Sequence, residues 1–88
     1  MLNYYFKSKI DEFIAKSTEE IIGAITMKTQ FDATTEQIWA WEQQITILKK
    51  ALYGKSGTIF FEFSIPRMGR RVDAIAIIQN VVFVIEFK

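Results

Sequence analysis

The pattern of hydrophobic and polar positions predicts helices in the first 53 residues and strands after them. Residues 1–16 are expected to be helical at least in part, with Ser8 as a candidate cap, because apolar residues recur there at helical spacing at Ile10, Phe13 and Ile14. A second helix should begin at Ser17, since a glutamate three residues later completes a capping box.

The helical pattern is clearest between Thr34 and Tyr53. Apolar residues step along this segment by three and four positions and form one stripe, made of Ile38, Trp41, Ile45, Leu48 and Leu52. Such a stripe is typical of a helix that packs on a sheet or on another helix. Thr34 or Thr35 should cap this helix, and Gly54 should end it.

The remainder of the chain is rich in Val, Ile and Phe and predicts three strands. The first runs from Thr58 to Ile65 and ends at Pro66, because proline cannot donate a ladder hydrogen bond. Residues 71–88 read as two further strands joined at Gln79 and Asn80. The predicted fold class is therefore α+β: N-terminal helices followed by a three-stranded, mainly antiparallel sheet.

Composition limits the chemistry. The 88 residues suit one small domain over residues 1–88, and the net charge of +1 creates no general attraction to nucleic acid. The chain has no histidine and no cysteine, which excludes Ser-His and Cys-His catalysis and favours oxygen ligands for any metal. No apolar run is long enough to span a membrane, and the N-terminus lacks a signal-peptide pattern, so a soluble cytoplasmic protein is expected.

Three ionisable residues converge in the last two predicted strands. If Gln79 and Asn80 form the whole turn, Asp73 falls directly opposite Glu86, and alternation puts Lys88 on the same face as Glu86. Two opposed carboxylates repel each other unless a cation lies between them. A divalent metal ion held by Asp73 and Glu86 would satisfy this requirement.

These residues also carry a resemblance to a known family. Asp73 on one strand and Glu86-Phe87-Lys88 on the next resemble the signature of the PD-(D/E)XK nuclease superfamily. The wider stretch from Phe61 to Asp73, with its Ile-Pro-Arg-Met-Gly-Arg-Arg-Val-Asp segment, is similar to a nuclease-like region found ahead of P-loop ATPase or helicase modules.

The resemblance implies a metal-dependent nuclease-like domain that hydrolyses phosphodiester bonds of nucleic acid, with DNA as the first expectation. Asp73 and Glu86 would hold Mg²⁺ or Mn²⁺, Lys88 would assist the attacking water, and Glu42 would be the acidic residue on the preceding helix. The family core is α-β-β-β-α-β, and the chain reaches only the signature lysine. The domain is therefore expected to be incomplete, and whether it is active stays open.

Each candidate residue also has a simpler interpretation. Asp73 and Glu86 could be solvated or paired with nearby cations, and Glu42 could be a solvated helix residue. A cluster of three arginines would either anchor phosphates or belong to a solvated turn: Arg67, Arg70 and Arg71. The face that Glu62 occupies depends on a strand register that the sequence leaves undecided.

Two further expectations concern partners. A non-catalytic interaction or regulatory domain on the same scaffold is the alternative to a nuclease. The helices can shield one face of the sheet, so we expect a homodimer that forms through an uncovered sheet face or edge. The sequence does not choose between these modes of association.

Overall fold

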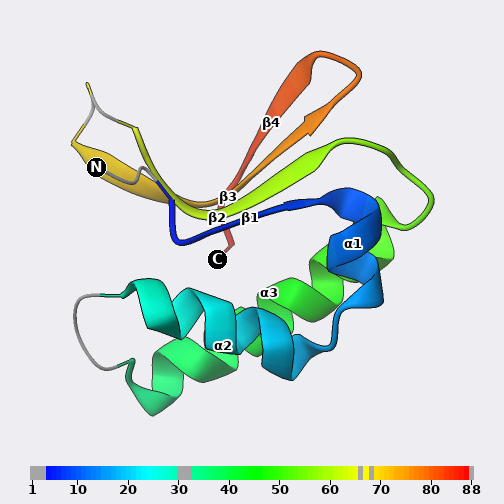
Figure 1. Cartoon of the computed structure of the whole chain (residues 1–88). Helices are drawn as coiled ribbons and strands as arrows, with labels where there is room; N and C mark the ends of the chain where they lie inside the picture. The colour runs from blue at the N-terminus through cyan, green and yellow to red at the C-terminus, as the bar shows by residue number, and fades with distance from the viewer. Residues whose placement is uncertain (1–3, 30–32, 66, 68, 88) are drawn as a thin grey trace.

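Helices cover one face of an antiparallel sheet (Figure 1). The structure is a computed structural model, and it describes residues 4–29, 33–65, 67 and 69–87. Within these residues the fold is α+β, with N-terminal helices and a four-stranded sheet in the order β1-β2-β3-β4. The elements along the chain are β1 (Phe6–Lys9), α1 (Ile10–Ala15), α2 (Thr18–Lys28), α3 (Thr35–Leu52), β2 (Thr58–Ile65), β3 (Arg70–Ile78) and β4 (Val81–Ile85).

Helices α2 and α3 begin where the sequence predicts. Ser17 and Glu20 form a capping box at the start of α2, and Thr34 and Gln37 form another at the start of α3. Each box satisfies backbone N–H groups that a helix start leaves without partners. None of the described helices is long and apolar enough to cross a membrane.

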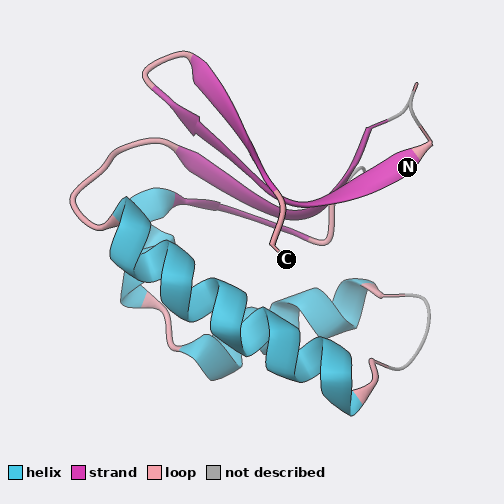
Figure 2. Ribbon diagram, turned by 180° about the vertical axis from the view of Figure 1, so that it is seen from behind, coloured by secondary structure: helices cyan, strands magenta, loops and turns pink. Residues whose placement is uncertain are grey.

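The predicted stripe of α3 forms the centre of the core. Its buried members are Trp41, Ile45, Leu48 and Leu52. They belong to one hydrophobic cluster with the sheet side chains that face the helices: Phe6, Ile59, Phe61, Ala74 and Ala76. All three described helices lie on this side of the sheet, as the view from behind also shows (Figure 2), which confirms that the helices shield one face.

The first strand corrects the prediction for the N-terminus. Residues Phe6–Lys9 form an edge strand, not a helix, so the sheet has four strands among the described residues instead of three. Buried Phe6 and Ser8 alternate with exposed Lys7 and Lys9, which is the period of a half-buried strand. The helix begins only at Ile10, and Ser8 does not cap it, because Lys9 holds the N-cap position without a side-chain cap bond.

The register of the last hairpin is as predicted. Gln79 and Asn80 both have positive φ, 51° and 67°, which is typical of a two-residue hairpin turn. Ile78 pairs with Val81, and the ladder continues in the same register until Ala74 pairs with Ile85.

The side-chain alternation of β2 breaks at Glu62. This residue has a φ of 54°, in the left-handed region that residues other than glycine rarely adopt within a strand. Phe60 and Phe63, three positions apart, consequently pack edge to face with ring centroids 5.4 Å apart. In a regular strand they would lie on opposite faces. The distortion thus changes the direction of the side chains at the end of β2 that leads to the β2–β3 connection.

Candidate functional site

Asp73 on β3 holds the segment that follows β4. Its Oδ2 accepts a hydrogen bond of 2.8 Å from the backbone N–H of Phe87, and Asp73 is partly buried. The predicted register accounts for this contact: β4 ends at Ile85, and one step beyond the last pair Asp73 meets the chain at residues 86–87. The structure therefore brings Asp73 next to residues 86–87, but the ladder ends at Ala74 and Ile85, so Asp73 and Glu86 do not form the cross-strand pair that the sequence predicts.

Glu86 is paired with an arginine. Its carboxylate accepts from the guanidinium of Arg70, and both side chains are about half exposed. This is the simpler interpretation that the sequence left open, in which a neighbouring cation balances the charge of Glu86. A surface ion pair of this kind contributes little stability, typically below about 1 kcal/mol, so a competing cation can replace the arginine at little cost.

Glu62 is the carboxylate that the sequence could not place. Phe61 pairs with Ala74 and Phe63 with Val72, so Glu62 lies across from Asp73 on the neighbouring strand. Burial raises the pKa of Glu62 above its ordinary value and the charge of Asp73 raises it further, while Arg71 acts in the opposite direction. This register follows from the short connection between the two strands, across which Ile65 pairs with Arg70.

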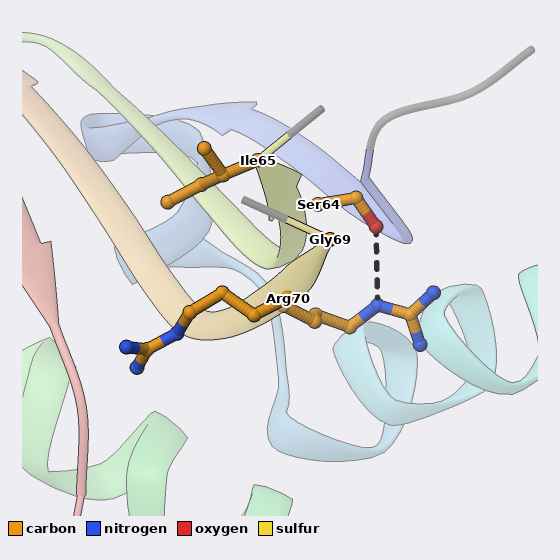
Figure 3. A pocket seen from close by; sticks show the side chains of 5 residues that line it. Ser64, Ile65, Gly69 and Arg70 are labelled. Atoms are coloured by element: carbon orange, nitrogen blue, oxygen red, sulfur yellow. Dashed lines mark hydrogen bonds between the residues drawn. The ribbon is translucent and has the colours of Figure 1, made fainter. Parts of the chain in front are cut away.

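Arg71 is held by two residues that the sequence analysis did not single out. Its guanidinium lies 4.3 Å from the ring centroid of Tyr5 and donates to the Tyr5 hydroxyl. Its Nε also lies 3.4 Å from Ser64 Oγ, a long hydrogen bond that is the dashed line in Figure 3. Stacking on an aromatic ring fixes the plane of a guanidinium and leaves its other N–H groups available for an anion.

A shallow hollow of about 320 Å³ lies beside these arginines and is lined by Ser64, Ile65, Gly69, Arg70 and Arg71. The side chain of Arg70 points away from Ser64 (Figure 3), and its guanidinium pairs with Glu86. Arg67 lies exposed in the β2–β3 connection. The side chains of Arg70 and Arg71 therefore point in different directions, although both residues line the hollow.

The remaining two candidates do not join these residues in the structure. Glu42 is exposed on α3, beside a surface depression that it lines with Gln43, Thr46 and Ile47. Lys88 lies outside the described residues. Within the part of the chain that the structure describes, no three or more Asp, Glu, His or Cys residues form a group that could hold a metal ion.

The carboxylates that do meet can act as a pair. Asp73 has Glu62 across from it on β2 and the Glu86 segment beside it on the other side. Magnesium commonly uses one or two carboxylates and completes its shell with water and substrate phosphates, so this donor set fits a weakly held Mg²⁺ or Mn²⁺. Comparison of the chain with protein-family models, with curated proteins and with solved structures finds no match.

Proposed function

We propose that the chain is a metal-dependent nuclease-like domain that hydrolyses phosphodiester bonds of nucleic acid. The observation that supports this most is the meeting of Glu62 and Asp73 on adjacent strands, where burial and mutual repulsion raise the pKa of Glu62. A divalent cation between the two carboxylates would remove that repulsion. The resemblance of Asp73 and Glu86-Phe87-Lys88 to the PD-(D/E)XK signature supplies the reaction class.

In this proposal Asp73 and Glu62 would hold Mg²⁺ or Mn²⁺ as a pair, and Glu86 would join them only after its carboxylate leaves Arg70. The bound ion lowers the pKa of its water and neutralises charge on the phosphate. Glu62 takes the place that the sequence analysis gave to Glu42, because it lies on the strand next to Asp73 whereas Glu42 is exposed on α3. Lys88 keeps the role that the resemblance implies, as a point charge near the attacked phosphate.

The arginines of the β2–β3 hairpin would bind the nucleic-acid backbone. Arg71 is the best oriented of them, since Tyr5 and Ser64 hold its guanidinium beside the hollow. Arg67 is exposed in the β2–β3 connection, so its guanidinium is accessible to a phosphate. Arg70 would exchange its bond to Glu86 for a phosphate when a metal takes the carboxylate.

A specific observation favours the alternative, a non-catalytic interaction domain. The ion pair between Arg70 and Glu86 already balances the charge that the sequence argument assigned to a metal. Glu86 therefore needs no metal ion to balance its charge in the folded chain. Direct measurement of metal binding separates the two functions.

Calorimetric titration with Mn²⁺, with and without a short DNA oligonucleotide, is the decisive experiment. Binding that disappears in Asp73→Asn and Glu62→Gln, but persists in Glu42→Gln, supports the nuclease-like function. The asparagine keeps an oxygen that can accept from the Phe87 N–H, so loss of binding would report the charge and not the fold. No heat from the folded wild-type chain under either condition would favour the interaction domain.

A further inference from the structure

Strand β4 is an exposed edge of the sheet with no charged residue. It pairs with β3 on one side, and in the described part of the chain nothing pairs with its other side. Its four residues from Val81 to Val84 are 48% to 58% exposed. Because successive strand residues point to opposite faces, both faces of this edge are apolar and accessible.

An apolar groove lies directly beneath this edge. The β3–β4 hairpin extends away from the helices (Figure 1), and a cavity of about 200 Å³ remains between it and the C-terminal half of α3. Every lining residue except Lys55 is apolar: Leu48, Ala51, Leu52, Ala76, Ile78, Phe83 and Ile85. A strand added at β4 would therefore gain backbone hydrogen bonds at the edge and a place for apolar side chains over the groove.

The opposite edge of the sheet, strand β1, is protected against pairing with another chain by its lysines. Strand β1 carries exposed Lys7 and Lys9, and lysines on an edge strand discourage pairing with another chain. Pairing of β1 with a second β1 would bring lysines together, and pairing of β1 with β4 would set lysines beside valines. Only the contact of β4 with a second β4 joins apolar residues to apolar residues along the whole strand.

We propose that this chain forms a two-fold dimer in which β4 pairs antiparallel with β4 of a second copy, centred on Phe83. This register puts Val82 opposite the partner's Val84 and Val81 opposite the partner's Ile85. One step further, Asn80 lies opposite the partner's Glu86, so an amide meets a carboxylate and no like charges oppose each other. A two-fold contact closes the assembly and leaves only the lysine-bearing β1 edges free.

The proposal is independent of any metal or nuclease activity, and paired charge changes test it. Val82 and Val84 share one face of β4. In the proposed dimer Val82 lies opposite the partner's Val84, and Val84 lies opposite the partner's Val82. The double variant Val82→Lys/Val84→Lys would place a lysine opposite a lysine at both of these cross-strand positions. The double variant Val82→Lys/Val84→Glu would instead place a lysine opposite a glutamate at both. Both variants alter exposed positions, and circular dichroism checks that both remain folded.

Sedimentation at micromolar to submillimolar concentrations gives the readout. We expect the wild type to approach twice the 10.3 kDa chain mass as concentration rises, the Lys/Lys variant to remain monomeric, and the Lys/Glu variant to dimerise with a dependence on salt. Backbone amides of β4 should become protected from hydrogen exchange only at concentrations where the dimer forms. A wild type that stays monomeric, equal loss of dimer in both variants, or open-ended assembly would overturn the proposal.

Discussion

Gly57 lies against the carbonyl oxygen of Ile77 so closely that a β-carbon on Gly57 would come within 2.0 Å of that oxygen. The glycine also has a φ of 151°, a conformation that other residues rarely adopt. Its own carbonyl accepts from the N–H of Ile10, so this one position joins the turn after α3 to both β3 and the start of α1.

Gly57→Ala should therefore destabilise the domain by at least about 2 kcal/mol, because either β3 or the turn must move. Gly23→Ala is the matched control: Gly23 is in α2, and a β-carbon there would meet nothing within 4 Å. That change should stabilise by about 0.5–1 kcal/mol through helix propensity. Urea unfolding measures both, and equal effects at the two glycines would contradict the close approach.

Leu48 should contribute strongly to the core. It is 3% exposed within the α3 stripe, while its neighbour Ile47 is 51% exposed. We expect Leu48→Ala to cost about 2–5 kcal/mol and Ile47→Ala less than about 0.5 kcal/mol. A loss at Leu48 as small as that at Ile47, measured by chemical denaturation, would show that α3 packs differently.

The pKa of Glu62 predicts a pH dependence of stability. Burial and then the charge of Asp73 raise the pKa in the folded state, so ionising Glu62 is harder in the folded than in the unfolded chain. Stability should fall as pH rises from the unfolded pKa through the raised folded pKa, and it should remain lower above that range. Glu62→Gln should abolish this fall in stability and increase stability at neutral pH. The control variant Glu42→Gln should leave the fall in place. Free energies of unfolding measured from pH 4 upward test both expectations.

Removing the Asp73 side chain should release residues 86–87. Asp73→Ala deletes the acceptor for the Phe87 N–H and should cost about 1–2 kcal/mol, while Asp73→Asn retains an acceptor oxygen and should cost less. Hydrogen exchange at the Phe87 amide should be fast in the alanine variant and slow in the asparagine variant. Unchanged protection in Asp73→Ala would show that other contacts hold this segment.

Local patterns in the sequence predict some parts of this structure well. The α3 stripe and the capping box at Ser17 depend on neighbours within one or two turns, and the register of the last hairpin depends on its two-residue turn. Strand β1 was missed because four residues carry too little periodicity, and because its partner strand is far away: Phe6 pairs with Phe61.

In the candidate site, too, local contacts could be predicted from the sequence, whereas the pairing of separate strands could not. The hairpin register was predicted and brings Asp73 near residues 86–87, but β4 ends at Ile85, so the predicted cross-strand pair of Asp73 with Glu86 does not form. The position of Glu62 was not predicted, because it depends on where β2 joins β3, and because the positive φ of a glutamate has no sequence signature. Glu42 was proposed from the family resemblance, which does not fix where a helix residue lies relative to the sheet.

The long separation between β1 and β2 also implies an order of assembly. Strands β2, β3 and β4 are joined by short connections and can pair soon after they meet, whereas β1 must wait until its partner, some fifty residues later in the chain, has formed. During synthesis the hydrophobic side chain of Phe6 stays without its final neighbours until Phe61 has left the ribosome. We expect the β2–β3–β4 meander to acquire exchange protection first in refolding and β1 to dock last, so the lysine-bearing edge of the sheet is the last edge to be completed.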